Sequence, residues 1–283
     1  MPHLALLPVL AAALDLFSTH GRVQLPGRTV RVPPPAATSS STSGEEGVSA
    51  EQCVSASEVE STRRLNAIFR ACSRGRAITK CESDEIRLLG GMKADRYGEI
   101  TPKGFSVLGK RLGLGPTDSF ADCGSGAGAA VLQAVSEFDV RASTGVEYAH
   151  TRHTTAKQEL SFRPELASRV TFECGDCAAS HQWGDGGALQ SSTVVWMCSE
   201  LFNDALMARL ASRISGSEHV RAVATLRPFP NGLHSYHQEL RPERCEMSWT
   251  AAMASPKGAG SLTQNLGAPV HIYVRSRMCR DAT

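Results

Sequence analysis

The sequence has no strong excess of charge of either sign. Its 283 residues carry 30 Lys and Arg against 28 Asp and Glu, which gives a formal net charge of +2 and a pI near 8.1. It also has no long Lys-rich tail for grasping DNA. The composition therefore excludes a strongly basic nucleic-acid protein, although local basic patches are compatible with it.

Long apolar runs are also lacking. The apolar stretch over residues 4–17 is broken by Pro8 and is too short to span a bilayer, so we expect no membrane partner. Residues 33–43 are rich in Pro, Ser and Thr, as in disordered linkers. We interpret residues 1–47 as a dispensable extension or a targeting segment, either an organelle transit peptide or a secretory signal. The missing basic start and the free cysteines weigh against the secretory signal.

Paired metal-binding motifs are missing as well. Cys174 and Cys177 form one Cys-x-x-Cys, but no second pair follows at zinc-ribbon spacing. The nine cysteines are odd in number, and several fall in expected buried strands, which favours free thiols in a reducing compartment. We therefore expect no metal site and interpret this pair as small residues beside a binding site.

A strand, a glycine-rich turn and a helix follow one another in the middle of the chain. Residues 119–123 read as a short buried strand and residues 129–138 as an apolar helix. Gly124, Gly126 and Gly128 lie between them, where they permit a tight bend and close approach of a ligand to the helix N-terminus. This pattern predicts a cradle for a nucleoside cofactor, although a plain strand-to-helix corner would also fit it.

The next two strands each end in an acid. Residues 142–147 read as a strand ending in Glu147, some 25 residues after Asp122 and near the spacing of ribose-binding acids. A third strand over residues 169–176 ends in Asp176, which is suited to an adenine amino group. Because an acid before the glycines is poorly suited to pyrophosphate, we expect a cationic, phosphate-free ligand. The series resembles class I S-adenosylmethionine methyltransferases.

The rest of the chain fits the same α/β fold. We expect strands over residues 193–198, 220–226, 243–250 and 269–276, with a helix over residues 205–214. The last two strands would pair antiparallel and complete a Rossmann-like, seven-stranded class I methyltransferase sheet. His234 and His237 fall in the loop before them, where we expect solvated side chains.

A helical region over residues 48–94 precedes the methyltransferase domain, which we place at residues 95–283. We expect this region to pack on the domain as an N-terminal helical cap. Its segment over residues 63–80 is the most basic part of the chain, with Arg63, Arg64, Arg70, Arg74, Arg76 and Lys80. A solvated helix face and a contact with DNA phosphates or an acidic partner are both compatible with it.

Three separated motifs are Tyr97-Gly98-Glu99, residues 120–128 and Ser248-Trp249-Thr250. Together they resemble one family more closely, the disruptor-of-telomeric-silencing (DOT1-like) methyltransferases that modify a histone H3 lysine. The resemblance implies that Tyr97, Glu99 and Thr101 close over S-adenosyl-L-methionine. Likewise it implies that Asp122 faces the methionine end, Glu147 the ribose and Asp176 the adenine. The full set of expected cofactor-binding residues is Tyr97, Gly98, Glu99, Thr101, Asp122, Gly124, Ser125, Gly126, Gly128, Glu147, Gly175, Asp176 and Cys177.

The acceptor side departs from that family's pattern. Cys198-Ser199 stands where the family has paired asparagines, Ile272 where it has a lysine-channel tyrosine, and Cys177 where it has a phenylalanine. Our candidates for a lysine channel are Ser199, Phe202, Trp249 and Tyr273.

Together with the resemblance, these observations predict a protein-lysine methyltransferase. The resemblance implies that it acts on histone H3 in the nucleosome and resides in the nucleus. One alternative is a methyltransferase of another protein or a small molecule, located in an organelle or the cytoplasm if the first 44 residues are a transit peptide. Another is a noncatalytic binding module on the same fold. The sequence does not indicate an oligomeric state.

Overall fold

The computed structural model of the chain describes residues 55–253 and 267–276. The chain divides into two units at Gln52, and our prediction for residues 1–47 lies outside the described residues. The helical region and the sheet that follows it belong to the same unit. Within the described residues no helix is long and apolar enough to cross a membrane.

Five parallel strands form the main part of the sheet, in the order β3-β2-β1-β4-β5. Their bounds are Ser119–Cys123 (β1), Ala142–Glu147 (β2), Val170–Cys174 (β3), Val194–Met197 (β4) and Ala222–Thr225 (β5). All five match the strands expected from the sequence. The order reverses between β1 and β4, and ligands of open α/β sheets bind at such a reversal, beyond the carboxyl ends of the strands.

The sheet continues with antiparallel strands. The strand β8 (Ala268–Arg275) pairs with β5 and also with β6 (Tyr236–Gln238) and β7 (Glu243–Cys245). The sheet thus has eight strands where we expected seven, with seven along one path and β7 beside it. The additional strand is β6, which we did not expect. Our loop assignment for His237 was wrong, because it lies in β6, but its side chain and that of His234 are exposed as expected.

The prediction of one strand over residues 243–250 was also wrong in its second half. After β7 the chain enters the short helix α8 (Ser248–Met253). Thr250 explains this change, because its hydroxyl accepts a hydrogen bond from the Met247 amide at 2.9 Å. The amides of Thr250 and Ala251 then bond back to the Met247 carbonyl, which begins a helix.

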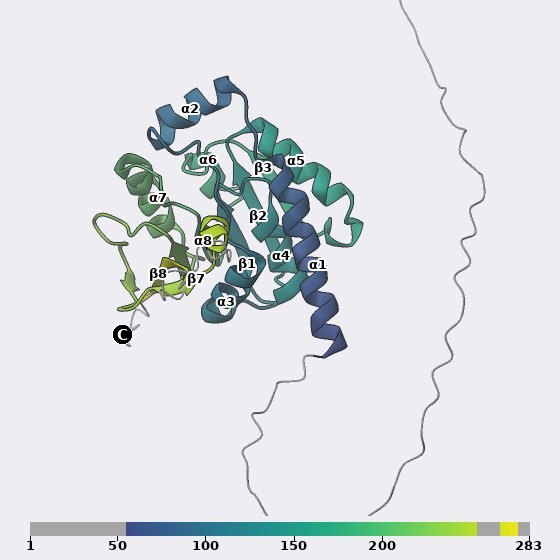
Figure 1. The fold of residues 1–283 in the computed structure, drawn as a ribbon. Helices are drawn as coiled ribbons and strands as arrows, with labels where there is room; N and C mark the ends of the chain where they lie inside the picture. Colours follow the sequence, from purple (N-terminus) through teal and green to yellow (C-terminus); the bar gives the residue numbers. More distant parts are fainter. Residues whose placement is uncertain (1–54, 254–266, 277–283) are drawn as a thin grey trace, which may run out of the picture. The chain divides into compact units, whose positions relative to one another are not determined.

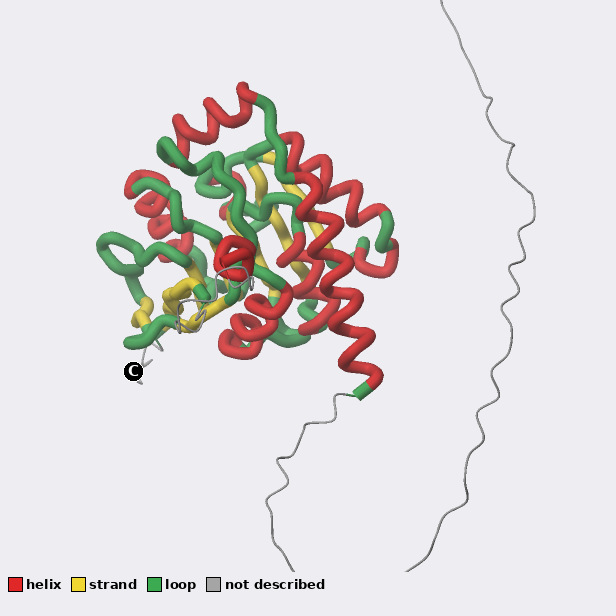
Figure 2. Tube along the Cα trace, in the orientation of Figure 1, coloured by secondary structure: helices red, strands yellow, loops and turns green. Residues whose placement is uncertain are grey.

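Helices cover both faces of the sheet (Figures 1 and 2). One face is covered by α1 (Ala56–Cys72), α3 (Pro102–Leu112), α4 (Ala129–Phe138) and α5 (His150–Ser161). The other face is covered by α7 (Asp204–Gly216) and the segment after α6 (Ser180–Trp183). The remaining helical elements are α2 (Lys80–Gly90) and the short turns η1 (Ser73–Gly75) and η2 (Pro164–Leu166).

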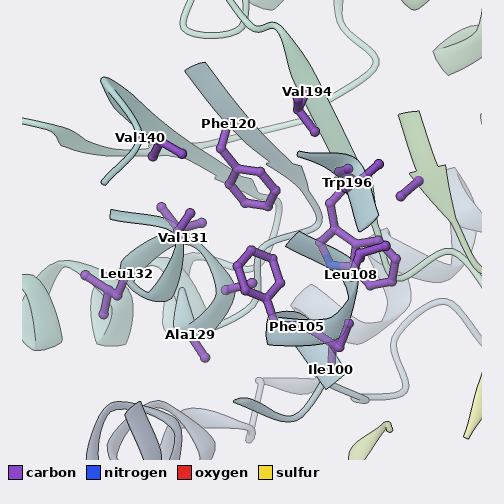
Figure 3. Packing of buried hydrophobic residues seen from close by; sticks show 14 of the residues in the cluster. Ile100, Phe105, Leu108, Phe120, Ala129, Val131, Leu132, Val140, Val194 and Trp196 are labelled. Atoms are coloured by element: carbon purple, nitrogen blue, oxygen red, sulfur yellow. The ribbon is translucent and has the colours of Figure 1, made fainter. Parts of the chain in front are cut away.

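The strand β1 separates two apolar clusters because successive side chains of a strand point to opposite faces. Phe120 packs with α3 and α4 on one face, with its ring 5.3 Å from that of Phe105 in an edge-to-face contact (Figure 3). Ala121 and Cys123 belong to the cluster on the other face, together with Leu210 of α7. This packing fixes the end of β1, where Asp122 and the glycine-rich turn lie.

The expected N-terminal cap consists of α1 and α2. Thr79 caps α2 in a reciprocal pair with Glu82. Glu82 also accepts a hydrogen bond from the Thr151 amide of α5 at 2.7 Å, so α2 is tied to the sheet's helical layer at its first turn. Its other end is tied to α7, because the Asn203 amide donates to the Gly90 carbonyl at 2.7 Å. The helix is thereby held across the carboxyl ends of the strands.

Candidate active site

A pocket lies at the carboxyl ends of β1, β2, β3 and β4, beneath α2. Its lining includes all the expected cofactor-binding residues except Thr101 and Gly128: Tyr97, Gly98, Glu99, Asp122, Gly124, Ser125, Gly126, Glu147, Gly175, Asp176 and Cys177. The structure therefore brings together the lid residues, the glycine-rich turn and three acids from a stretch that runs from Tyr97 to Cys177, 80 residues apart in the sequence.

The turn after β1 is shaped by glycines. Gly126 has a φ of 56°, in the left-handed region that disfavours a side chain. A Cβ at this position would lie 2.9 Å from the ring of Tyr97. The Gly126 amide donates to a carboxylate oxygen of Glu147 at 2.8 Å. The turn is thus closed on one side by Tyr97 and on the other by the acid that ends β2.

Two polar groups beside this turn have no hydrogen-bond partner among the described residues. They are Asp122 Oδ1 and the Ser125 hydroxyl, both fully covered by protein and both on residues that line the pocket. Buried polar groups in native proteins are almost always paired. Burial raises the pKa of the Asp122 carboxyl well above its usual value, and the neighbouring Glu147 and Glu99 raise it further. The site is therefore suited to a ligand that brings hydrogen-bond donors and positive charge.

Glu147 ends β2 and is 6% exposed. Its two oxygens accept the amides of Gly126, at 2.8 Å, and Ala149, at 2.9 Å. Burial raises the pKa of this carboxyl, while Arg152 and the two amides oppose that effect. Each oxygen keeps a lone pair, so the carboxylate can accept two further hydrogen bonds, as a vicinal diol requires.

The segment over residues 97–99 forms a lid whose two polar side chains hold each other. The Tyr97 hydroxyl donates to one oxygen of Glu99, and the Ser73 hydroxyl donates to the other at 2.6 Å. The Glu99 carbonyl accepts the Ser248 amide of α8 at 2.8 Å. The Glu99 carboxylate lines the pocket as expected, but both of its oxygens also serve to fix the lid.

The far end of the pocket combines one acid with apolar walls. Asp176 accepts the Ala178 amide at 2.8 Å through Oδ1, and its Oδ2 pairs with Arg209 of α7. Ile86 and Leu89 of α2 and Leu206 of α7 line the same pocket and were missed in the sequence. The spacing of Ile86 and Leu89 on one helix face was an available signal.

Two expected cofactor residues do not line the pocket. Thr101 caps α3, where its hydroxyl accepts the Gly104 amide at 3.1 Å and donates to the Glu246 carboxylate at 2.8 Å. Gly128 faces the core, since a Cβ there would lie 2.5 Å from the ring of Phe172. Both residues support the walls of the site and have no surface in it.

Among the acceptor-side candidates, only Phe202 lines the pocket. Its ring edge lies 3.4 Å from where a Cβ on Gly124 would be. Ser199 is fully buried and does not line the pocket. Its hydroxyl pairs with the Thr225 hydroxyl and accepts the Arg227 amide at 3.1 Å, so it joins the ends of β4 and β5. A place for Ser199 in a lysine channel stays a prediction.

Trp249 and Tyr273 lie outside the pocket lining as well. The Trp249 ring packs behind the lid, 2.4 Å from a Cβ position on Gly98. Tyr273 is 1% exposed, and its hydroxyl accepts the Phe229 amide at 3.1 Å. Because Tyr273 and Ile272 are consecutive in β8, they belong to clusters on opposite faces of the sheet, so the tyrosine cannot take the place of a side chain at Ile272.

The cysteines near the site carry no metal-binding geometry. Within the described residues there is no group of three or more His, Cys, Asp or Glu side chains that could hold a metal ion. Cys174 is exposed and Cys177 is buried in the pocket wall. Cys198 lines the pocket and donates to the Gly98 carbonyl at 3.4 Å, which ties β4 to the lid.

Comparison with known proteins agrees with this site. Residues 78–267, more than half of the chain, match the family model described as histone methylation protein DOT1. The chain belongs to the DOT1 family. The match begins within the helical cap and includes the lid, the glycine-rich turn and all three acids.

Two curated relatives are similar over short stretches. One is from Debaryomyces hansenii, 34% identical over 91 residues, and one is from Candida albicans, 33% identical over 90 residues. Each is named histone-lysine N-methyltransferase, H3 lysine-79 specific, and each match covers 32% of this chain. The matches span only 8% and 6% of the relatives' own lengths.

Solved structures with partial likeness are also methyltransferases. An RNA methyltransferase from Salinibacter ruber in complex with S-adenosyl-L-homocysteine is 15% identical, with a TM-score of 0.37 over 63% of this chain and 94% of that one. The putative methyltransferase yhhF from Escherichia coli is 15% identical, with a TM-score of 0.43 over 61% and 86%. These TM-scores are low, so the fold assignment rests on the strand order.

Proposed function

We propose that this DOT1-family chain is an S-adenosyl-L-methionine-dependent protein-lysine methyltransferase. The observation that carries the proposal is the Asp122 carboxylate, which lines the pocket together with Glu147 and has one oxygen without a hydrogen-bond partner among the described residues. These groups fit an adenosine-containing cation without phosphates, because they offer acceptors to an ammonium group and to ribose hydroxyls. Asp122 would hold the methionine end, Glu147 the ribose, and Asp176 the adenine.

The bound cofactor supplies an activated methyl group on a sulfonium, so no nucleophilic side chain is needed. The chain's own residues bind and orient the cofactor and exclude water. Tyr97 and Glu99 close the lid over the turn, and Phe202 and Cys198 form an apolar wall where β4 ends. An apolar mouth lowers the pKa of an entering lysine ammonium, which favours the uncharged amine that must attack.

For the acceptor, we propose a lysine of histone H3 in the nucleosome core, and hence a nuclear location. The names of the two curated relatives and the family assignment support this choice. The exposed basic residues of the cap, among them Arg70 and Arg74, would face DNA phosphates.

One feature of the site favours a second acceptor class, a different protein or a small molecule. Ser199 and Tyr273 are both engaged in buried hydrogen bonds away from the pocket, and of the four expected channel residues only Phe202 lines it. A noncatalytic binding module would be the third outcome, and the intact set of three acids argues against it.

A transfer assay separates these outcomes. Tritiated S-adenosyl-L-methionine is incubated with nucleosomes, free histones or a cell extract, together with the wild type, Asp122→Asn or Asp139→Asn. The control residue Asp139 is an exposed acid at the end of α4, away from the pocket. We expect label on histone H3, lost with Asp122→Asn and retained with Asp139→Asn.

Other results would redirect or overturn the proposal. Label found only on another protein or a small molecule would exclude the histone and leave the methyltransferase. Absence of transfer together with absence of cofactor binding by calorimetry would leave the fold without the chemistry.

A further inference from the structure

An arginine that we did not single out in the sequence is part of the pocket wall. Arg152 is in the first turn of α5, lines the pocket and is only 6% exposed. Arginine is almost never buried to this extent unless its charge is paired and its donors are used. The groups around Arg152 must therefore pair with its charge and accept hydrogen bonds from its donors.

Two of its hydrogen bonds go to backbone carbonyls on either side of α2. Arg152 Nε donates to the Arg76 carbonyl at 3.3 Å, just after η1, and Nη2 donates to the Asp95 carbonyl at 2.9 Å, two residues before the lid. The guanidinium thus joins the chain before α2 to the chain after it. Because it is planar and has several donors in a fixed fork, it can bond two carbonyls at once.

The same group faces two residues of the pocket. Its central carbon lies 4.8 Å from the centre of the Tyr97 ring, which is a cation–π distance. Its Nη1 lies 4.0 Å from the Glu147 carboxylate, with both side chains nearly inaccessible. Tyr97 in turn packs on Gly126 of the turn. One buried charge therefore contacts the lid and the ribose acid together.

Arg152 is the main positive charge among the charged groups around Glu147. Acids face the carboxylate from β1 (Asp122) and from α2 (Glu82), and the Cys174 thiol faces it from β3. Glu99 of the lid adds a further acid beside Asp122. Arg152 is the group that lowers the pKa of Glu147 most, against the effect of burial.

We propose that Arg152 is a positioning residue that holds the lid against the glycine-rich turn and orients Glu147 to accept the ribose diol of the cofactor. The inference rests on the proposed function, since it concerns the same pocket. Arg152 acts through Tyr97, Glu147 and two carbonyls, and it needs no contact with the cofactor.

The test measures binding of S-adenosyl-L-homocysteine, so that no methyl acceptor is required. Calorimetry compares the wild type with Arg152→Met, which keeps length and apolar contact but removes charge and donors. Arg163→Met is the matched control, because Arg163 lies just beyond the other end of α5 and pairs with Glu159, outside the pocket. We expect Arg152→Met to weaken binding roughly 10- to 100-fold, as for loss of charged hydrogen bonds, and Arg163→Met to leave affinity unchanged.

The pH dependence separates positioning from mere structural support. Burial already raises the pKa of Glu147, and removing Arg152 raises it further. The protonated carboxyl accepts fewer hydrogen bonds, so the ratio of the variant's Kd to the wild-type Kd should grow as pH falls from 8 to 6. Ionisation of the ligand cancels in this ratio. In a Glu147→Gln background the ratio should vary much less with pH, and the remainder comes from Glu99, whose pKa Arg152 also lowers.

Arg152→Lys supplies a second readout if the methionine variant does not fold. It retains the charge and loses the two-carbonyl fork, so we expect weaker binding with the wild-type pH dependence. Wild-type affinity in Arg152→Lys, or a pH-independent ratio in Arg152→Met, would overturn the inference. Failure of the wild type itself to bind S-adenosyl-L-homocysteine would instead overturn the proposed function.

Discussion

The proposed cofactor side and the proposed acceptor side of the pocket are built in different ways. On the cofactor side, the acids end parallel strands and the glycines form the turn after β1, so the backbone places them. On the acceptor side, Ser199 and Tyr273 hold buried amides of the β5 end, and only Phe202 faces the pocket. The first half of the site is fixed by chain topology, whereas the second depends on where individual side chains point.

This difference decides what each half can tolerate. A turn with left-handed glycines and packed neighbours accepts almost no substitution, because the strain has no place to relax. Residues that pack behind the pocket wall can be substituted with a loss of stability but no loss of affinity. Substitutions on the two sides should therefore separate affinity from stability.

The largest effect is expected at the turn itself. Gly126→Ala would place a methyl group 2.9 Å from Tyr97 at a φ of 56°. Strain of about 1–3 kcal/mol should weaken binding of S-adenosyl-L-homocysteine by roughly 5- to 100-fold in calorimetry.

Gly113→Ala is the matched control for this change. Gly113 ends α3 with a φ of 60° and has nothing within 4 Å of its Cβ position. It should lower the free energy of unfolding by about 1 kcal/mol and leave affinity unchanged. Equal losses of affinity in both variants would show that the turn has no special role.

A smaller effect is expected at the one acceptor-side residue in the pocket. Phe202→Ala removes a ring that lies against the turn at Gly124 and should raise the KM for the methyl acceptor about tenfold while changing cofactor affinity less. Steady-state kinetics with saturating cofactor measures this. Phe162→Ala, at an exposed ring at the end of α5, is the control and should change neither constant. An unchanged KM in Phe202→Ala would place the acceptor path elsewhere.

Much of the cofactor side could be predicted from the sequence because it depends on local patterns. A buried strand followed by closely spaced glycines places Asp122 and Gly126, and an acid at the end of the next strand places Glu147. Arg152 gave no such signal, since its partners come from residues 76, 95, 97 and 147 and meet only in the folded chain.

The acceptor side could not be predicted in the same way. Tyr273 was expected in the channel because it is next to Ile272, but in a strand the neighbouring residue faces the opposite way. Ser199 is at the expected strand end, yet its hydroxyl is turned towards Thr225. The helix α8 was missed for a similar reason, because its start depends on a local hydrogen bond of Thr250. A correct position along the chain therefore did not show in which direction the side chain points.

The smallest effect on function is expected at Tyr273. Its hydroxyl accepts the buried Phe229 amide, which has no other partner among the hydrogen bonds of the described residues. Tyr273→Phe should leave that amide unpaired and lower the free energy of unfolding by about 1–3 kcal/mol in urea denaturation. Cofactor affinity and acceptor KM should stay at wild-type values, because the ring and its edge-to-face contact with Phe229 are retained. A raised acceptor KM without a loss of stability would return Tyr273 to the channel and remove the distinction between the two sides.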